Sequence, residues 1–233
     1  MTSRRVQVAC AWCGPLFVVV FFAGMLIAGF IPPKPATDTA REVAAFYRDD
    51  TTAIRLGLLL MMVSAAFTLP FSAVISVQMK RVEGDFAPLA YTQLAGGAVG
   101  AVAILVPVLM FTAAAFRPGR APEIIQALND LAMIPFVMNF PPAIVQCFSI
   151  AAVAFQGTSP HVFPRWVGHY NVWTAILFMP AGLATFYKTG PFAWNGAVSF
   201  WLAAVLFGSW FLVMSVVVRR AIAQQPEPVP VAA

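Results

Sequence analysis

Long blocks without ionisable side chains are the feature that most constrains this chain. Between Val6 and Pro33 two cysteines are the only ionisable residues. Runs without Asp, Glu, Lys or Arg recur at 56–79, 86–116, 131–160, 166–187 and 189–218. A helix rises about 1.5 Å per residue, so about 20 apolar residues cross the hydrocarbon core of a bilayer. Each block is near or above that length, and the sequence therefore predicts a membrane protein.

Composition excludes a water-soluble fold and leaves room for one domain. Of the 233 residues, 61% are hydrophobic and 10% are charged, whereas about 25% are charged in a soluble domain. A span with its connection takes about 35 to 40 residues, so the chain accommodates six helices. We predict an all-α, polytopic transmembrane helical bundle of six spans, with a single domain over 1–222 and a disordered cytoplasmic tail over 223–233.

The spans expected from prolines and polar turns are 13–31, 53–78, 89–115, 133–156, 170–187 and 194–218. Two short amphipathic helices are expected on the membrane surface, one after span one and one after span three. The first covers 39–48, where Thr39 and Glu42 have the spacing of a capping box. The second begins near Pro122, and its expected apolar face is Ile124, Ile125, Leu128 and Leu131.

Basic residues indicate the orientation of the chain. Tandem pairs flank spans on one side only, at 4–5, 80–81 and 219–220, and six spans bring both termini to that side. Lysine and arginine favour the cytoplasmic face, so we expect both termini in the cytoplasm. The net charge of +5 comes from isolated pairs beside apolar runs. Membrane lipids with anionic headgroups are therefore the expected partners, and nucleic acid is not.

The strongest polarity inside a span surrounds two adjacent prolines in span four. Asn139, Pro141, Pro142 and Gln146 lie within eight residues. Prolines free backbone carbonyls, and a nearby amide satisfies those carbonyls or holds a ligand. Spans two to five each contain an expected proline break, which is typical of a bundle that encloses a cavity. The alternative is the ordinary tolerance of membrane helices for proline.

Two further features concern packing and the membrane interface. Gly96 and Gly100 form a Gly-x-x-x-Gly pattern in span three, which permits close helix contact within the chain or between two copies. Arg55 stands about one turn inside span two. It is expected to reach lipid headgroups or to pair with Asp49 or Asp50.

Motifs for catalysis and for cofactors are missing. No Gly-rich phosphate loop, Gly-x-Ser-x-Gly elbow or His-Glu-x-x-His sequence occurs. A zinc site formed by Cys10, Cys13, His161 and His169 is topologically allowed, but two interfacial cysteines that pack as small apolar residues are the favoured interpretation. We therefore expect no metal and no cofactor, and no catalytic residue is assigned.

Two short motifs resemble a known family. The string Phe-Pro-Arg-Trp-Val-Gly at 163–168 and the string Glu-Val-Ala-Ala-Phe-Tyr-Arg at 42–48 resemble the pattern of small bacterial integral membrane proteins of the DUF4386 type. The resemblance implies about six helices, a surface helix after the first, and a bacterial cytoplasmic (inner) membrane location. That family has no established activity, so it transfers no catalytic residue. Arg165 and Trp166 suit a headgroup anchor, with a guanidinium for phosphate and an indole for the interface.

Three functions are compatible with these patterns. The favoured one is a non-enzymatic membrane component, either an accessory subunit beside a partner membrane subunit or homo-oligomer, or a bundle that binds a small lipophilic molecule near span four. The second is a transporter or permease for a neutral or hydrophobic compound. The third is a membrane-embedded enzyme that uses the cysteines or histidines.

Overall fold

The computed structural model describes residues 4–157 and 162–225, and these residues form helices without any strand among them. The predicted all-α class is confirmed. The α-helices are α1 (Arg4–Ile27), α2 (Ala40–Asp49), α3 (Thr51–Ala65), α4 (Thr68–Glu83), α5 (Pro88–Phe116), α6 (Pro122–Val137), α7 (Pro141–Gln156), α8 (Arg165–Phe178) and α9 (Ala203–Ala223). A 3₁₀ segment, η1 (Met179–Thr185), follows α8, and a π-helical segment, η2 (Ala197–Leu202), precedes α9.

Five helical segments in the described part of the chain are long and apolar enough to cross a membrane: Arg4–Ile27, Thr51–Glu83, Pro88–Phe116, Pro122–Gln156 and Ala197–Ala223. A further segment consists of α8 and η1 and is only partly α-helical. Many large apolar side chains on these segments point outward, and those more than half exposed include Val19, Leu59, Val99 and Val205. Acyl chains are the solvent that matches such a surface. The chain is a membrane protein, while the count of six spans stays a prediction.

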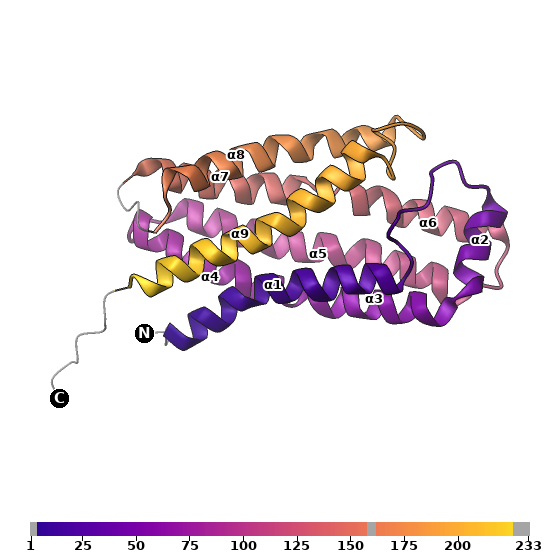
Figure 1. Ribbon diagram of the computed structural model, residues 1–233, viewed down its shortest axis with the longest axis horizontal. Coiled ribbons are helices and arrows are strands. Elements are labelled where there is room, and N and C mark those ends of the chain that lie inside the picture. The colour runs from indigo at the N-terminus through magenta and orange to yellow at the C-terminus, as the bar shows by residue number, and fades with distance from the viewer. Residues whose placement is uncertain (1–3, 158–161, 226–233) are drawn as a thin grey trace.

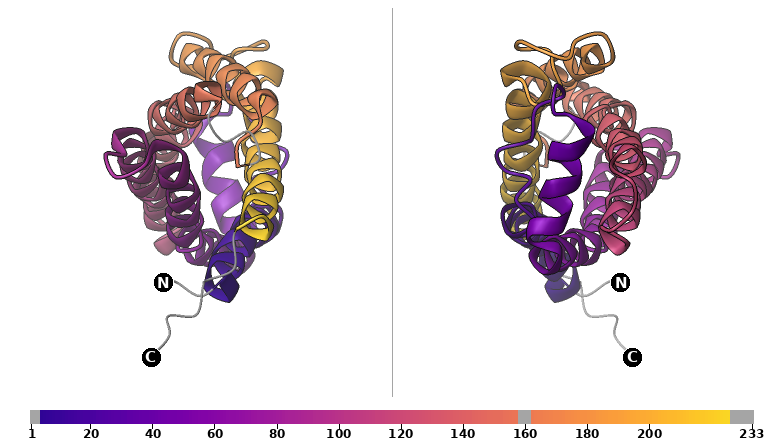
Figure 2. Two further views of the ribbon diagram at one scale, coloured as in Figure 1. Left: turned by 90° about the vertical axis from the view of Figure 1, so that its left-hand side faces the viewer. Right: turned by 90° about the vertical axis from the view of Figure 1, so that its right-hand side faces the viewer.

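The segments run back and forth along one long axis (Figure 1). α1 leads away from the end at which both termini lie, α3 and α4 return, and α5 leads away again. The α6–α7 pair returns, α8 with η1 leads away, and η2 with α9 comes back. α2 crosses the opposite end of the bundle (Figure 2). We refer to these as the termini end and the α2 end.

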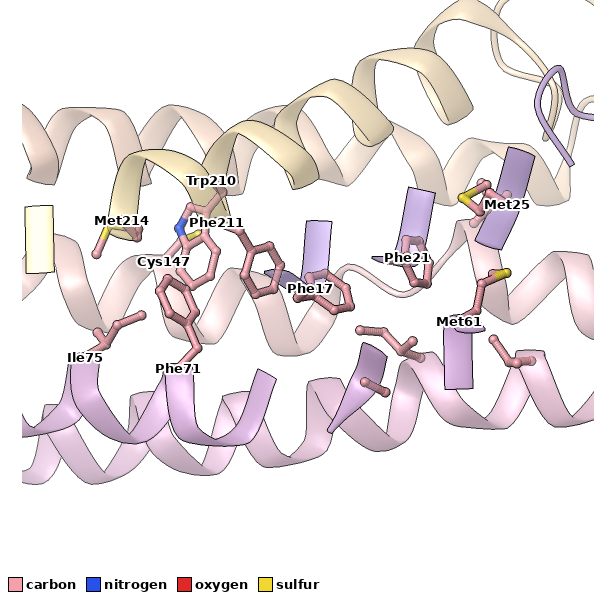
Figure 3. Packing of buried hydrophobic residues seen from close by; sticks show 14 of the residues in the cluster. Phe17, Phe21, Met25, Met61, Phe71, Ile75, Cys147, Trp210, Phe211 and Met214 are labelled. Carbon is pink, nitrogen blue, oxygen red and sulfur yellow. The ribbon is translucent and has the colours of Figure 1, made fainter. Parts of the chain in front are cut away.

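Aromatic rings fill the middle of the bundle between α1, α4 and α9 (Figure 3). The ring centroid of Phe211 lies 4.5 Å from that of Phe17 and 5.4 Å from that of Phe71. Trp210 meets Phe71 edge to face, with the ring planes at 87°. Such pairs contribute about 0.5–1.5 kcal/mol each beyond the burial of their area. They fix how the three helices meet.

Span two breaks three to four residues before Pro70. α3 ends at Ala65 and α4 begins at Thr68, so Ala66 and Phe67 separate them. A proline ring clashes with the carbonyl four residues earlier, which here belongs to Ala66. The break follows from this clash.

The other prolines act differently from one another. Pro107 lies inside α5, which continues without a break, so the expected interruption of span three is wrong. α5 packs against α3, α4, α6 and α7, and these contacts stabilise the helix on both sides of Pro107. Span four does break, at 138–140. Span five also changes, because α8 turns into the 3₁₀ segment η1 with Pro180 in its first turn.

The first amphipathic helix is confirmed as α2, with its capping box complete. The backbone N–H of Glu42 donates to Thr39 Oγ1 at 3.4 Å, and the N–H of Thr39 donates to the Glu42 carboxylate at 2.7 Å. These two bonds satisfy donors that the start of a helix otherwise leaves without partners.

The apolar face of α2 lies on protein and not on lipid. Val43, Ala44 and Tyr47 are buried, and the Tyr47 hydroxyl donates to Asn129 Oδ1 of α6 at 3.0 Å. Burial, with a smaller effect of the Asp130 charge, raises the pKa of Tyr47 above its usual value. Tyr47 therefore stays a hydrogen-bond donor, and α2 closes one end of the bundle.

The second expected surface helix is not separate. α6 runs from Pro122 through Pro135 to Val137 along the bundle and leads into α7 (Figure 1). Ile125 is buried, whereas Ile124 and Leu131 are about half exposed, so the four expected residues do not form one covered face. The helix is therefore part of the fourth long apolar segment. Most of the expected tail lies outside the described residues, and α9 itself continues to Ala223.

We predict a pH-dependent contribution of Glu42 to stability. Hydrogen bonds from Thr39 hold the pKa of Glu42 below its usual value. The stabilisation is therefore present above the ordinary glutamate pKa of about 4.3 and is lost as pH falls through the lower folded value. Glu42→Gln should lower the thermal unfolding midpoint in detergent at pH 7 and have a smaller effect near pH 3. Glu123→Gln is the control, and an equal effect of Glu42→Gln at both pH values would contradict the assignment.

Candidate functional site

A cavity of about 100 Å³ lies inside the bundle, in the half toward the α2 end. Much of its wall is aromatic: Phe21, Phe22, Phe136, Phe140, Phe178, Phe200 and Phe207. Asn139 and Ser199 are polar side chains on this wall. An apolar cavity with a few polar groups is the usual form of a small-molecule site.

Three irregular stretches of backbone meet at this cavity. The break at 138–140 contributes Asn139, η1 contributes Ala181, and η2 contributes Ser199. Long 3₁₀ runs and π-helical turns are uncommon and often mark functional sites or hinges. Irregular backbone at membrane depth is tolerated only where protein buries it or where it lines a cavity. The break at 138–140, η1 and η2 meet this condition, because each of them lines the cavity.

Two smaller cavities adjoin the first. One, of about 50 Å³, shares Asn139, Phe178 and Phe207 with it and extends toward Gln146 and Ser72. The other, of about 30 Å³, shares Met25, Phe136 and Phe200 with it and reaches Lys34, Asp38 and Trp194 at the α2 end. The three cavities form a row from the α2 end to the middle of the bundle.

The structure brings Asn139, Pro142 and Gln146 together on the wall of the 50 Å³ cavity. The amide of Gln146 donates to Ser72 Oγ at 3.3 Å. The Asn139 side chain is half-buried, and no other described residue forms a hydrogen bond with it. Pro141 is exposed and lines none of the three cavities, in contrast to the other three residues of the expected group. It occupies the first turn of α7, where a proline suits the helix start.

α5 packs closely on α4 and α7 beside the 50 Å³ cavity, which Gly97 and Gly100 help to line. A Cβ on Gly96 would lie 2.9 Å from Gln146 Cγ, and one on Gly97 would lie 2.6 Å from Ser72 Cβ. A Cβ on Gly100 would meet Gln146 and Pro142 at 3.9 Å, which is ordinary contact. The tight pair is therefore Gly96 and Gly97, and both lie against helices of the same chain.

Arg55 has partners that the sequence did not indicate. Its guanidinium donates to the carbonyls of Ala115 at 3.1 Å and Phe116 at 2.9 Å, at the end of α5. One of the expected partners, Asp50, instead accepts from the Ala53 N–H at the start of α3. Arg55 thus caps a helix whose last carbonyls lack intrahelical donors.

Arg165 and Trp166 begin α8, and both are exposed. The neighbouring Gly168 is buried, and a Cβ there would lie 2.6 Å from a ring carbon of Phe155 on α7. The Pro-Arg-Trp-Val-Gly turn therefore sets the contact of α7 with α8 and leaves its first two helical residues outside. Their headgroup role stays a prediction.

The metal alternative receives no support from the described residues. Cys10 and Cys13 are half-buried free thiols, and Cys13 Sγ donates to the Ala9 carbonyl. His169 packs on the Phe155 ring, with centroids 5.0 Å apart. His161 lies outside the described residues, and no group of three His, Cys, Asp or Glu within them is arranged to hold a metal.

The aromatic wall is the part of the site that sequence reasoning missed. Phe136 and Phe140 flank Asn139 in the sequence, and this pattern could have indicated aromatic side chains around Asn139. Ser199 and Phe200 lie in η2, and no proline within η2 indicates its irregular helix in the sequence. The meeting of η2 with the break in span four is a tertiary feature.

No family model, no curated protein and no solved structure matches the chain. The resemblance to the DUF4386 type stays a prediction.

We predict opposite tolerance at two neighbouring glycines. Gly97→Ala places a methyl group against Ser72 and 2.9 Å from Gln146 Nε2, so it should destabilise the bundle by about 1–3 kcal/mol. Gly100→Ala has room and gains helix propensity, so its unfolding midpoint should match or exceed that of the parent protein. Thermal unfolding in detergent compares the two variants. Equal stability of both would show that α5 does not pack on α4 and α7 in this register.

Proposed function

We propose that the protein binds a small lipophilic molecule in the phenylalanine-lined cavity at Asn139, as a non-enzymatic component of the bacterial cytoplasmic membrane with both termini in the cytoplasm. The observation that carries the proposal is the convergence of three irregular stretches of backbone, the break at 138–140, η1 and η2, on one apolar cavity. Regular helices would pair all the backbone N–H and C=O groups within each helix. We therefore attribute the breaks to the binding of a ligand and not to packing alone.

The size and polarity of the cavity define the ligand class. An apolar cavity of about 150 Å³ holds one benzene ring in a well-studied protein, and drug-sized ligands need about 300–1,000 Å³. The cavity of about 100 Å³ therefore fits a single small ring or the end of an alkyl chain. Asn139 offers both a donor and an acceptor, so the ligand carries a hydroxyl or carbonyl group near its apolar part.

A transporter for a neutral or hydrophobic compound is the second candidate, because the cavities form a row that reaches the α2 end. The row also extends to Ser72 and Gln146 in the middle of the bundle. A flux assay in proteoliposomes distinguishes the two functions. Binding without movement of the ligand above that in empty vesicles supports the binder.

The test uses two adjacent positions of α9. Ala204 lines the cavity, whereas its neighbour Val205 is 66% exposed on the outside. Ala204→Phe should fill the cavity and Val205→Phe should leave it open. Protein purified in mild detergent is extracted and analysed by mass spectrometry, and its binding of C4–C8 1-alkanols is measured by calorimetry.

The parent protein and Val205→Phe should carry the same small molecule or bind the alkanols equally, and Ala204→Phe should bind neither. Asn139→Leu should weaken binding about 2- to 10-fold, because one hydrogen bond contributes about 0.5–1.5 kcal/mol. Alkanol binding that survives in Ala204→Phe would place the ligand elsewhere. Absence of both a co-purified molecule and alkanol binding in the parent protein would refute the proposal.

A further inference from the structure

The termini end of the bundle carries a second concave feature, between the first turns of α1 and the last turns of α9. The two helices are held together there by hydrogen bonds from Arg4 to the Ala223 carbonyl and from Ser215 Oγ to the Ala11 carbonyl, the latter at 2.8 Å. Figure 1 shows both helix ends side by side. A cleft of about 380 Å³ opens beside this junction.

The lining of the cleft divides into a basic part and an apolar part. Arg4, Arg219 and Arg220 supply three guanidinium groups, and Val8 and Val216 supply apolar surface next to them. Neither α1 nor the η2–α9 segment contains an aspartate or a glutamate. The two helices that form the cleft therefore carry no carboxylate that would neutralise the three arginines.

The arginines lie at the depth of a membrane interface. Arg219 and Arg220 directly follow a run of 30 uncharged residues, 189–218. The guanidinium carbon of Arg219 lies 4.2 Å from the centroid of the Trp12 ring, which is half-exposed. Tryptophan is enriched at the headgroup level, and stacking on its ring holds a guanidinium in place without neutralising it.

We infer that this cleft binds an anionic phospholipid. The phosphate would lie among Arg4, Arg219 and Arg220, and an acyl chain would run along Val8 and Val216. Basic pockets between transmembrane helices on the cytoplasmic side are suited to such headgroups. A free anion would need the guanidinium groups alone, whereas the apolar wall beside them matches the chain of a lipid. The site is separate from the phenylalanine-lined cavity and does not depend on the function proposed for it.

The test measures lipid selectivity in detergent. Binding of palmitoyl-oleoyl phosphatidylglycerol and phosphatidylcholine is compared by native mass spectrometry for three proteins. These are the parent chain, the double variant R219Q/R220Q, and the control R41Q/K188Q, which removes the same charge at exposed positions at the α2 end. Arg4 is kept because it caps α9.

The parent protein and the control should bind the anionic lipid at least about 10-fold more tightly than phosphatidylcholine. R219Q/R220Q should lose that preference and keep its unfolding midpoint within a few degrees. Loss of preference in the control as well would show a general charge effect and overturn the site. Displacement of the lipid by millimolar inorganic phosphate would assign the cleft to free anions and also overturn it. A parent protein that binds the two lipids equally would also overturn the site.

Discussion

Backbone polar groups within hydrocarbon must find partners inside the protein, because no water is there to bond them. Most of this chain meets that demand with helix, and where a helix stops, a side chain takes over. The Thr68 hydroxyl donates to the Ala65 carbonyl at the break between α3 and α4, and the Ser199 hydroxyl donates to the Phe192 carbonyl beside η2. The same demand explains why three irregular segments lie together. The three stretches line one cavity together, with Asn139, Ala181 and Ser199 on its wall.

At the two ends of the bundle, arginine side chains bond the backbone carbonyls that the helices leave without donors. Arg55 donates to the last carbonyls of α5, while Arg4 and Arg81 donate to the last carbonyls of α9. A guanidinium offers several donors in a fixed fork and keeps its charge when partly buried, so one residue can satisfy two carbonyls. The positive charge also interacts favourably with the carboxyl end of a helix. Arginines that the sequence presents as signals of orientation therefore also join helices that are far apart in the chain.

Hydropathy and capping patterns predicted the helical class, the long apolar segments and the start of α2, because these depend on residues close in the sequence. The effect of each proline could not be predicted in the same way. Pro70 coincides with a break and Pro107 does not, since four packed neighbours hold α5 together. The partner of Tyr47 and the packing of Gly97 are likewise set by helices distant in the chain. For the candidate site, Asn139 was visible in the sequence beside two prolines and Gln146. Most of the aromatic wall, however, comes from α1, α8, η2 and α9, which are distant from Asn139 in the chain.

The junction of α1 with α9 has a consequence for how the protein is made. It joins residues 204 and 219 positions apart, so α9 leaves the ribosome long after α1. α1 can pack on α3 early in synthesis, but the surface around Phe17 that receives α9 stays uncovered until α9 has been made. Closure of the bundle is thus a late event of biogenesis, and a nascent chain exposes an aromatic seam to other proteins in the membrane until α9 inserts.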